Sequence, residues 1–178
     1  MLAAVLALVV FLLVVEPLLV GLHELGHAIV PLGLGKETAV FVGGKRGPSL
    51  SVGSLTLTIA PAGVLSPITD GAVVTDVQTG RWAVFAGTLG GPLTSLLVAV
   101  GAAFALETVR GPFLEWLVLF AFAYGTLQTL STLAPISGPV PTDGGEAFKT
   151  DGRIALELLL GRDPVLDGDG GTLSREFE

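Results

Sequence analysis

Three long apolar stretches dominate the hydrophobic pattern of this chain. The first covers residues 1–32, where the run LAAVLALVVFLLVV is followed by Glu16, Pro17 and more apolar sequence. The second covers about residues 82–106 and the third about residues 113–134. Because crossing the hydrocarbon core of a bilayer takes roughly 20 apolar residues, each stretch is long enough to form a transmembrane helix.

Residues 35–80 follow a different pattern. The short runs ETAVFV, LSVGSLTLTI and AVVTDV are rich in β-branched residues and are separated by Gly/Pro-rich turn sequence. From Ser54 to Ile59, polar and apolar residues alternate, as in a strand with two different faces. We therefore expect an α-helical membrane protein with about three transmembrane helices. A small membrane-associated β element is expected between the first and second helices.

The remainder of the chain extends this picture. A Pro/Gly-rich stretch at residues 135–145 favours extended backbone, and the run RIALELLLG that begins at Arg153 predicts a short helix. Acidic residues gather after it. We expect residues 1–161 to form one core and residues 162–178 to form an acidic C-terminal tail.

Composition narrows the class of protein. Hydrophobic residues make up 51% of the chain and charged residues 14%, against about 25% charged residues in ordinary soluble domains. The chain has no cysteine, which excludes disulfides, thiolate zinc sites and cysteine nucleophiles. It has no basic patch with interleaved aromatic residues, so nucleic acid is not an expected partner, whereas the lipid bilayer is.

The basic residues predict an orientation in the cell membrane. Residues 34–81 and the C-terminal part each carry four of them: Lys36, Lys45, Arg46 and Arg81, then Lys149, Arg153, Arg162 and Arg175. The connection at residues 107–112 carries only Arg110. By the positive-inside rule, we expect a multi-pass protein with its N-terminus outside and with the β-like segment and C-terminus in the cytoplasm.

The candidate chemistry lies near the end of the first apolar stretch, in the sequence HELGH at residues 23–27. Positions i and i+4 share one face of a helix, so His23 and His27 can converge on one metal ion. Glu24 can then act as the base that takes a proton from the attacking water. Histidine is absent elsewhere in the chain, and ionisable groups inside a membrane are costly unless they serve a function. We expect one Zn²⁺ per chain.

Glu16 is a second carboxylate in the same stretch. It precedes His23 by seven residues and so lies on about the same helix face, on the order of 10 Å away. That separation is too large for a zinc ligand. Either a supporting role beside the site or a purely structural role next to Pro17 fits its position.

Together these features resemble the site-2-protease family of intramembrane zinc metalloproteases. The resemblance covers a first span that ends in HELGH, a β-like insertion, a middle span with Gly-Gly-Pro, and a following PxPxDGG sequence. It implies that His23 and His27 are ligands, that Glu24 is the catalytic base, and that an aspartate of a DG motif is the third ligand. It also implies that the β-like segment presents unwound substrate.

The chain departs from the family pattern at two kinds of position. Two DG motifs follow the third span. We favour Asp143 slightly as the third ligand because fewer residues separate it from the end of that span, and Asp151 is the alternative. Where the family has an asparagine after Gly-Pro, this chain has Thr94 and Ser95, whose hydroxyls are candidates to contact substrate or an oxyanion. Another family asparagine corresponds to Thr132.

The expected function is zinc-dependent cleavage of membrane-anchored protein substrates, as in regulated intramembrane proteolysis. The alternative is a zinc-binding membrane scaffold or binding module without protease activity. Glu24 favours the enzyme, since binding alone needs the histidines but not the base. The altered asparagine positions favour the binding module.

Overall fold

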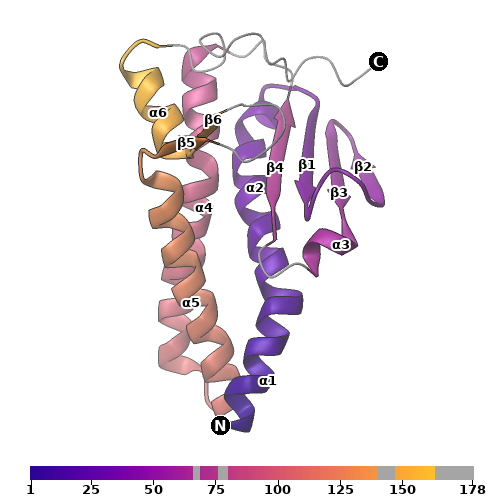
Figure 1. The fold of residues 1–178 in the computed structure, drawn as a ribbon, viewed down its shortest axis with the longest axis vertical. Coiled ribbons are helices and arrows are strands. Elements are labelled where there is room, and N and C mark those ends of the chain that lie inside the picture. Colours follow the sequence, from indigo (N-terminus) through magenta and orange to yellow (C-terminus); the bar gives the residue numbers. More distant parts are fainter. Residues whose placement is uncertain (66–68, 76–79, 140–146, 163–178) are drawn as a thin grey trace.

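The computed structural model describes residues 1–65, 69–75, 80–139 and 147–162. The chain is mostly helical, with two small sheets (Figure 1). Its helices are α1 (Leu2–Val10), the π-helix η1 (Phe11–Val15), α2 (Glu16–Gly33), α3 (Pro61–Val64), α4 (Arg81–Thr108), α5 (Pro112–Leu133) and α6 (Asp151–Leu159). Its strands are β1 (Thr38–Val42), β2 (Ser49–Val52), β3 (Leu55–Ile59), β4 (Gly71–Thr75), β5 (Ser137–Pro139) and β6 (Ala147–Lys149).

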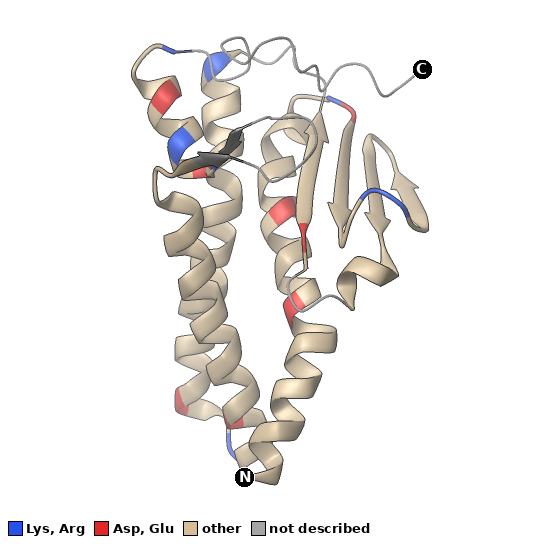
Figure 2. Ribbon diagram, in the orientation of Figure 1, with Lys and Arg blue, Asp and Glu red and all other residues tan. Residues whose placement is uncertain are grey.

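Three helical stretches are long and apolar enough to cross a membrane: Leu2–Gly33, Arg81–Thr108 and Pro112–Leu133. They agree with the predicted stretches. Charged positions of α4 and α5 lie at the helix ends, whereas acidic positions interrupt α2 along its length (Figure 2). Large apolar side chains cover the outer helix surfaces; Leu97 and Leu127, for example, are 70% and 67% exposed. Apolar surface of this extent is typical of a face that meets lipid or a partner.

The first stretch remains helical through Pro17. Proline has no N–H group, so it cannot bond to the carbonyl four residues earlier. Just before it, η1 widens the helix, and the Glu16 N–H donates to the carbonyl of Phe11, five residues back. This π-type turn accommodates the proline without breaking the helix.

The main sheet has the strand order β2-β3-β1-β4, with β1 parallel to β3 and antiparallel to β4. Strands form in all three runs expected within residues 35–80, and the run LSVGSLTLTI divides into the two antiparallel strands β2 and β3. The sheet stands beside α2, on the side away from α5 (Figure 1). Strand β1 is almost wholly buried, and Val40 is fully enclosed. Strand β4 forms one edge of this sheet in the described part of the chain.

Helices α2 and α4 cross with their backbones in contact. A Cβ atom on Gly26 would collide with the carbonyl of Gly90, and a Cβ on Gly90 would collide with the carbonyl of Gly26. A Cβ on Gly91 would overlap the His27 ring. Glycine is therefore required at this crossing, which brings α4 directly against the histidine face of α2.

Helix α6 confirms the helix expected from RIALELLLG. Thr150 caps it, with its side chain accepting from the Arg153 N–H. Lys149 Nζ and Arg153 Nε each donate to the buried Glu157 carboxylate at 2.8 Å. The hydrogen bond from Lys149 lowers the pKa of Glu157 below its ordinary value. The acidic tail, apart from Arg162, lies outside the described residues.

Candidate metal centre

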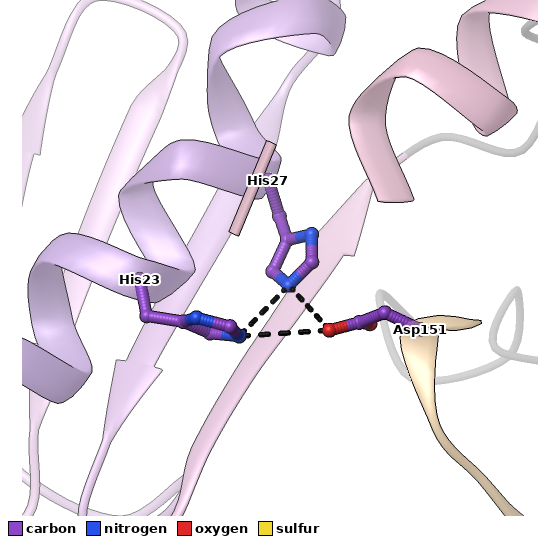
Figure 3. A group of neighbouring side chains, drawn as sticks. All are labelled: His23, His27 and Asp151. Carbon is purple, nitrogen blue, oxygen red and sulfur yellow. Dashed lines mark hydrogen bonds and ion pairs between the residues drawn. The ribbon is translucent and has the colours of Figure 1, made fainter. Parts of the chain in front are cut away.

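The two histidines of HELGH project from one face of α2 (Figure 3). Their Nε2 atoms lie 3.2 Å apart. His23 is buried, with 4% of its surface exposed, and His27 is half-buried. The i, i+4 spacing therefore brings the two imidazoles together as predicted.

Asp151 brings a carboxylate to the same point. Its Oδ2 lies 3.6 Å from His23 Nε2 and 3.5 Å from His27 Nε2. One ligand atom from each of the three residues falls within 4.8 Å of the other two. Figure 3 shows Asp151 reaching the pair from the opposite side. Asp143, the favoured third ligand, lies outside the described residues, and its alternative is the one placed beside the histidines.

A short hairpin explains how Asp151 reaches the site. Strands β5 and β6 pair antiparallel, so the chain that leaves α5 returns to it. The Ile136 N–H donates to Thr150 Oγ1 at 3.1 Å, and the Thr150 hydroxyl donates to the Ala134 carbonyl. A Cβ on Gly152 would collide with the carbonyl of Leu133. The start of α6 is thus held against the end of α5.

Hydrogen bonds fix the His27 ring. His27 Nδ1 lies 2.9 Å from the carbonyl oxygen of Gly87. A carbonyl can only accept, so Nδ1 must carry the proton. The Gly91 N–H also approaches Nδ1, at 3.4 Å, but this longer contact is the weaker one. In the neutral ring the lone pair of His27 is then on Nε2, which faces His23 and Asp151.

Hydrogen bonds through Ser95 to Gln128 fix the orientation of the His23 ring. Ser95 Oγ donates to Gln128 Oε1 at 2.9 Å, which uses its single hydrogen. The same oxygen lies 2.8 Å from His23 Nδ1 and so accepts from it. The lone pair of His23 is consequently on Nε2 as well. Partners of this kind on the second ring nitrogen are typical of metal-binding histidines.

This donor set fits a cation. When both imidazoles are neutral, their Nε2 atoms and the carboxylate oxygen of Asp151 face one another, and all three atoms are acceptors. They repel one another unless positive charge lies between them. Two histidines and one carboxylate are a ligand set of catalytic zinc sites, which leave a further position open.

Glu24 shares a cavity with the three candidate ligands. The cavity measures about 600 Å³ and lies between α2, α4, the end of α5, the start of α6 and β4. Glu24 is buried, and a Cβ on Gly71 would meet its carboxylate, so β4 begins directly against this side chain. Val73 and Thr75 of the same strand also line the cavity.

Thr94 and Ser95 have protein partners in the structure. The Thr94 hydroxyl donates to the Gly90 carbonyl at 2.9 Å, and Ser95 is bonded to His23 and Gln128. Neither residue lines the cavity, whereas Thr132 does. Gln128 was not expected from the sequence. The feature that could have indicated its role is its polar side chain within an apolar stretch, where polar groups need hydrogen-bond partners.

Ser95→Ala is expected to weaken zinc binding by about 10- to 100-fold, the usual cost of losing a partner of a metal-binding histidine. Without the hydroxyl, the Nδ1 proton of His23 loses its acceptor and the ring loses its orientation. Zinc titration of the purified protein measures this. Thr94→Ala removes the neighbouring hydroxyl and should leave zinc affinity unchanged. Equal affinities of the two variants would contradict the assigned role.

Comparisons with models of protein families, with curated proteins and with solved structures found no match for this chain.

Proposed function

We propose that this chain is a zinc-dependent intramembrane endopeptidase of the site-2-protease type, which cleaves membrane-anchored proteins. The observation that carries the proposal is the convergence of His23, His27 and Asp151 beside Glu24 in one cavity. The resemblance of HELGH and of the DG motif to that family supports it. The three long apolar helices support a position in the bilayer.

His23, His27 and Asp151 would hold the zinc ion. Zinc supplies a Lewis acid that polarises the scissile carbonyl and activates water at neutral pH. Glu24 accepts the proton of the attacking water and passes it to the leaving amine. Its buried position keeps bulk water away from the carboxylate, which strengthens its interaction with charge that develops nearby.

The edge of β4 offers a place for the substrate backbone. Peptide bonds within a helix are shielded by their own hydrogen bonds, so a substrate must be extended before it can be cut. An extended segment can add to a free strand edge through main-chain hydrogen bonds. Strand β4 lines the cavity and begins against Glu24, so a segment paired with it would lie beside the base.

Purified wild-type protein is expected to cleave a subset of a library of transmembrane peptides, and a zinc chelator should abolish the cleavage. Removing zinc takes away the Lewis acid without altering the chain. Mass spectrometry of the products and metal analysis of the enzyme measure both results, and restored zinc should restore cleavage. A protein that binds one zinc per chain but cleaves nothing in the library would support the binding-module alternative.

The orientation in the membrane is also testable. We propose that the N-terminus lies outside and that residues 35–80 and 135–178 lie in the cytoplasm, because basic residues concentrate in those segments. The chain contains no cysteine, so a single introduced cysteine gives a clean accessibility signal. Lys45→Cys should react with a membrane-impermeant thiol reagent only after the cells are opened. Reaction in intact cells would reverse the orientation.

A further inference from the structure

A second buried carboxylate lies on α2, outside the metal centre. Glu16 is 5% exposed, and the proposed reaction does not use it. Its side chain accepts three hydrogen bonds. The Thr69 N–H donates to Oε1 at 3.2 Å, the Thr69 hydroxyl donates to Oε2 at 2.6 Å, and the Tyr124 hydroxyl donates to Oε1 at 3.3 Å.

These bonds join three parts of the chain. Glu16 begins α2, Tyr124 belongs to α5, and Thr69 leads into β4. The Tyr124 ring is itself held by Phe11, whose ring centroid is 5.8 Å away in an edge-on arrangement. The carboxylate therefore connects the entry of the edge strand to two of the long helices.

The same segment meets α2 again two residues later. Thr69 bonds to Glu16, and Gly71 packs against the carboxylate of Glu24. On α2 these two glutamates are about 12 Å apart along the helix axis. The start of β4 thus runs along α2 between a fixed point at Glu16 and the base of the proposed reaction.

We propose that Glu16 is a positioning residue that fixes the entry of β4, so that the strand edge keeps its place beside Glu24. This inference rests on the proposed function, in which that edge receives the substrate backbone. A buried carboxylate is costly within an apolar helix, and three converging donors fix its direction and offset that cost.

Thr69 provides the sharpest test, because it offers a matched pair of variants. Thr69→Val removes the hydroxyl donor, whereas Thr69→Ser keeps it. Thr69→Val should raise KM for a cleaved transmembrane peptide about tenfold, the scale of one charge-assisted hydrogen bond, with kcat and zinc content close to wild type. Thr69→Ser should behave like wild type.

Glu16→Gln should give the same result, because an amide offers one accepting oxygen in place of two. The double variant with Thr69→Val should add little to either single change, since both remove the same contact. Glu107→Gln is the matched control, an identical change at an exposed position at the far end of α4, and should leave KM unchanged. Loss of kcat and zinc in place of a rise in KM would overturn the proposal, because it would indicate general loosening of the fold.

A distance measurement tests the position of the sheet without any cleavage. Spin labels at Leu50 of β2 and Leu97 of α4, both exposed, report how the sheet lies against the helices. The distance distribution should broaden in Thr69→Val and Glu16→Gln but not in Thr69→Ser. An unchanged distribution in both of the first two variants overturns the inference. A wild-type protein that cleaves no peptide would count against the proposed function alone, because the spin-label distances test the role of Glu16 without any cleavage.

Discussion

Replacing Glu24 by glutamine is expected to lower kcat at least about a hundredfold while one zinc stays bound per chain. Glutamine has nearly the same size and leaves the contact with Gly71 in place. Its amide cannot take up a proton from water, so general-base catalysis is lost. The proposed ligands His23, His27 and Asp151 are unchanged, so zinc affinity should stay at the wild-type value. Single-turnover cleavage of a transmembrane peptide and metal analysis measure the two quantities.

Glu107→Gln is the control for this change as well. It removes one carboxylate at an exposed position at the end of α4, away from the cavity lining, and should cleave at the wild-type rate. Equal rates for Glu24→Gln and wild type would exclude Glu24 as the base. A variant that lost its zinc would instead show that Glu24 supports the metal centre.

Replacing Asp151 by asparagine is expected to weaken zinc binding by more than the 10- to 100-fold that loss of a supporting partner costs, and to abolish cleavage. Its carboxylate oxygen lies 3.5 and 3.6 Å from the two imidazole nitrogens. Removing its charge leaves two neutral ligands, which are too few for a stable zinc site. Asparagine keeps the shape of the side chain, so the start of α6 should be preserved. Zinc titration and circular dichroism measure affinity and fold.

Asp143→Asn is the matched control, since the second DG motif offers the same substitution at a different place in the chain. It should retain zinc and activity. The reverse result, with zinc lost in Asp143→Asn and kept in Asp151→Asn, would make Asp143 the third ligand. Zinc kept in both variants would mean that the ligand comes from elsewhere.

The three long helices and the strands between α2 and α4 could be predicted because their signals are local. Length and hydropathy place the long helices, and β-branched runs separated by turn sequence place these strands. The order of the strands could not be predicted in this way. Strand β1 pairs in parallel with β3, not with β2, which follows it in the chain. This pairing depends on how the strands pack against α2.

The candidate metal centre could also be predicted only in part. His23 and His27 are one helical turn apart, so their meeting follows from helix geometry alone. The place of Asp151 depends on the antiparallel pairing of β5 with β6. This pairing brings Thr150, and with it the start of α6, back to the end of α5, although many residues separate the two helices. Counting residues along the sequence therefore favoured the nearer aspartate. The Ser95 contact with His23 depends on the crossing of α2 and α4, which no single segment encodes.

The distance along the chain between the ligands has a consequence for how the protein is made. The histidines belong to the first long helix, and Asp151 opens the last helix of the described chain. A ribosome therefore delivers the histidine pair to the membrane well before it has synthesised the third ligand. Until α6 has folded against α4 and α5, the proposed zinc site lacks its third ligand. If the proposed protease needs all three ligands, we expect it to be inactive during its own translation and to gain activity only after α6 has been made.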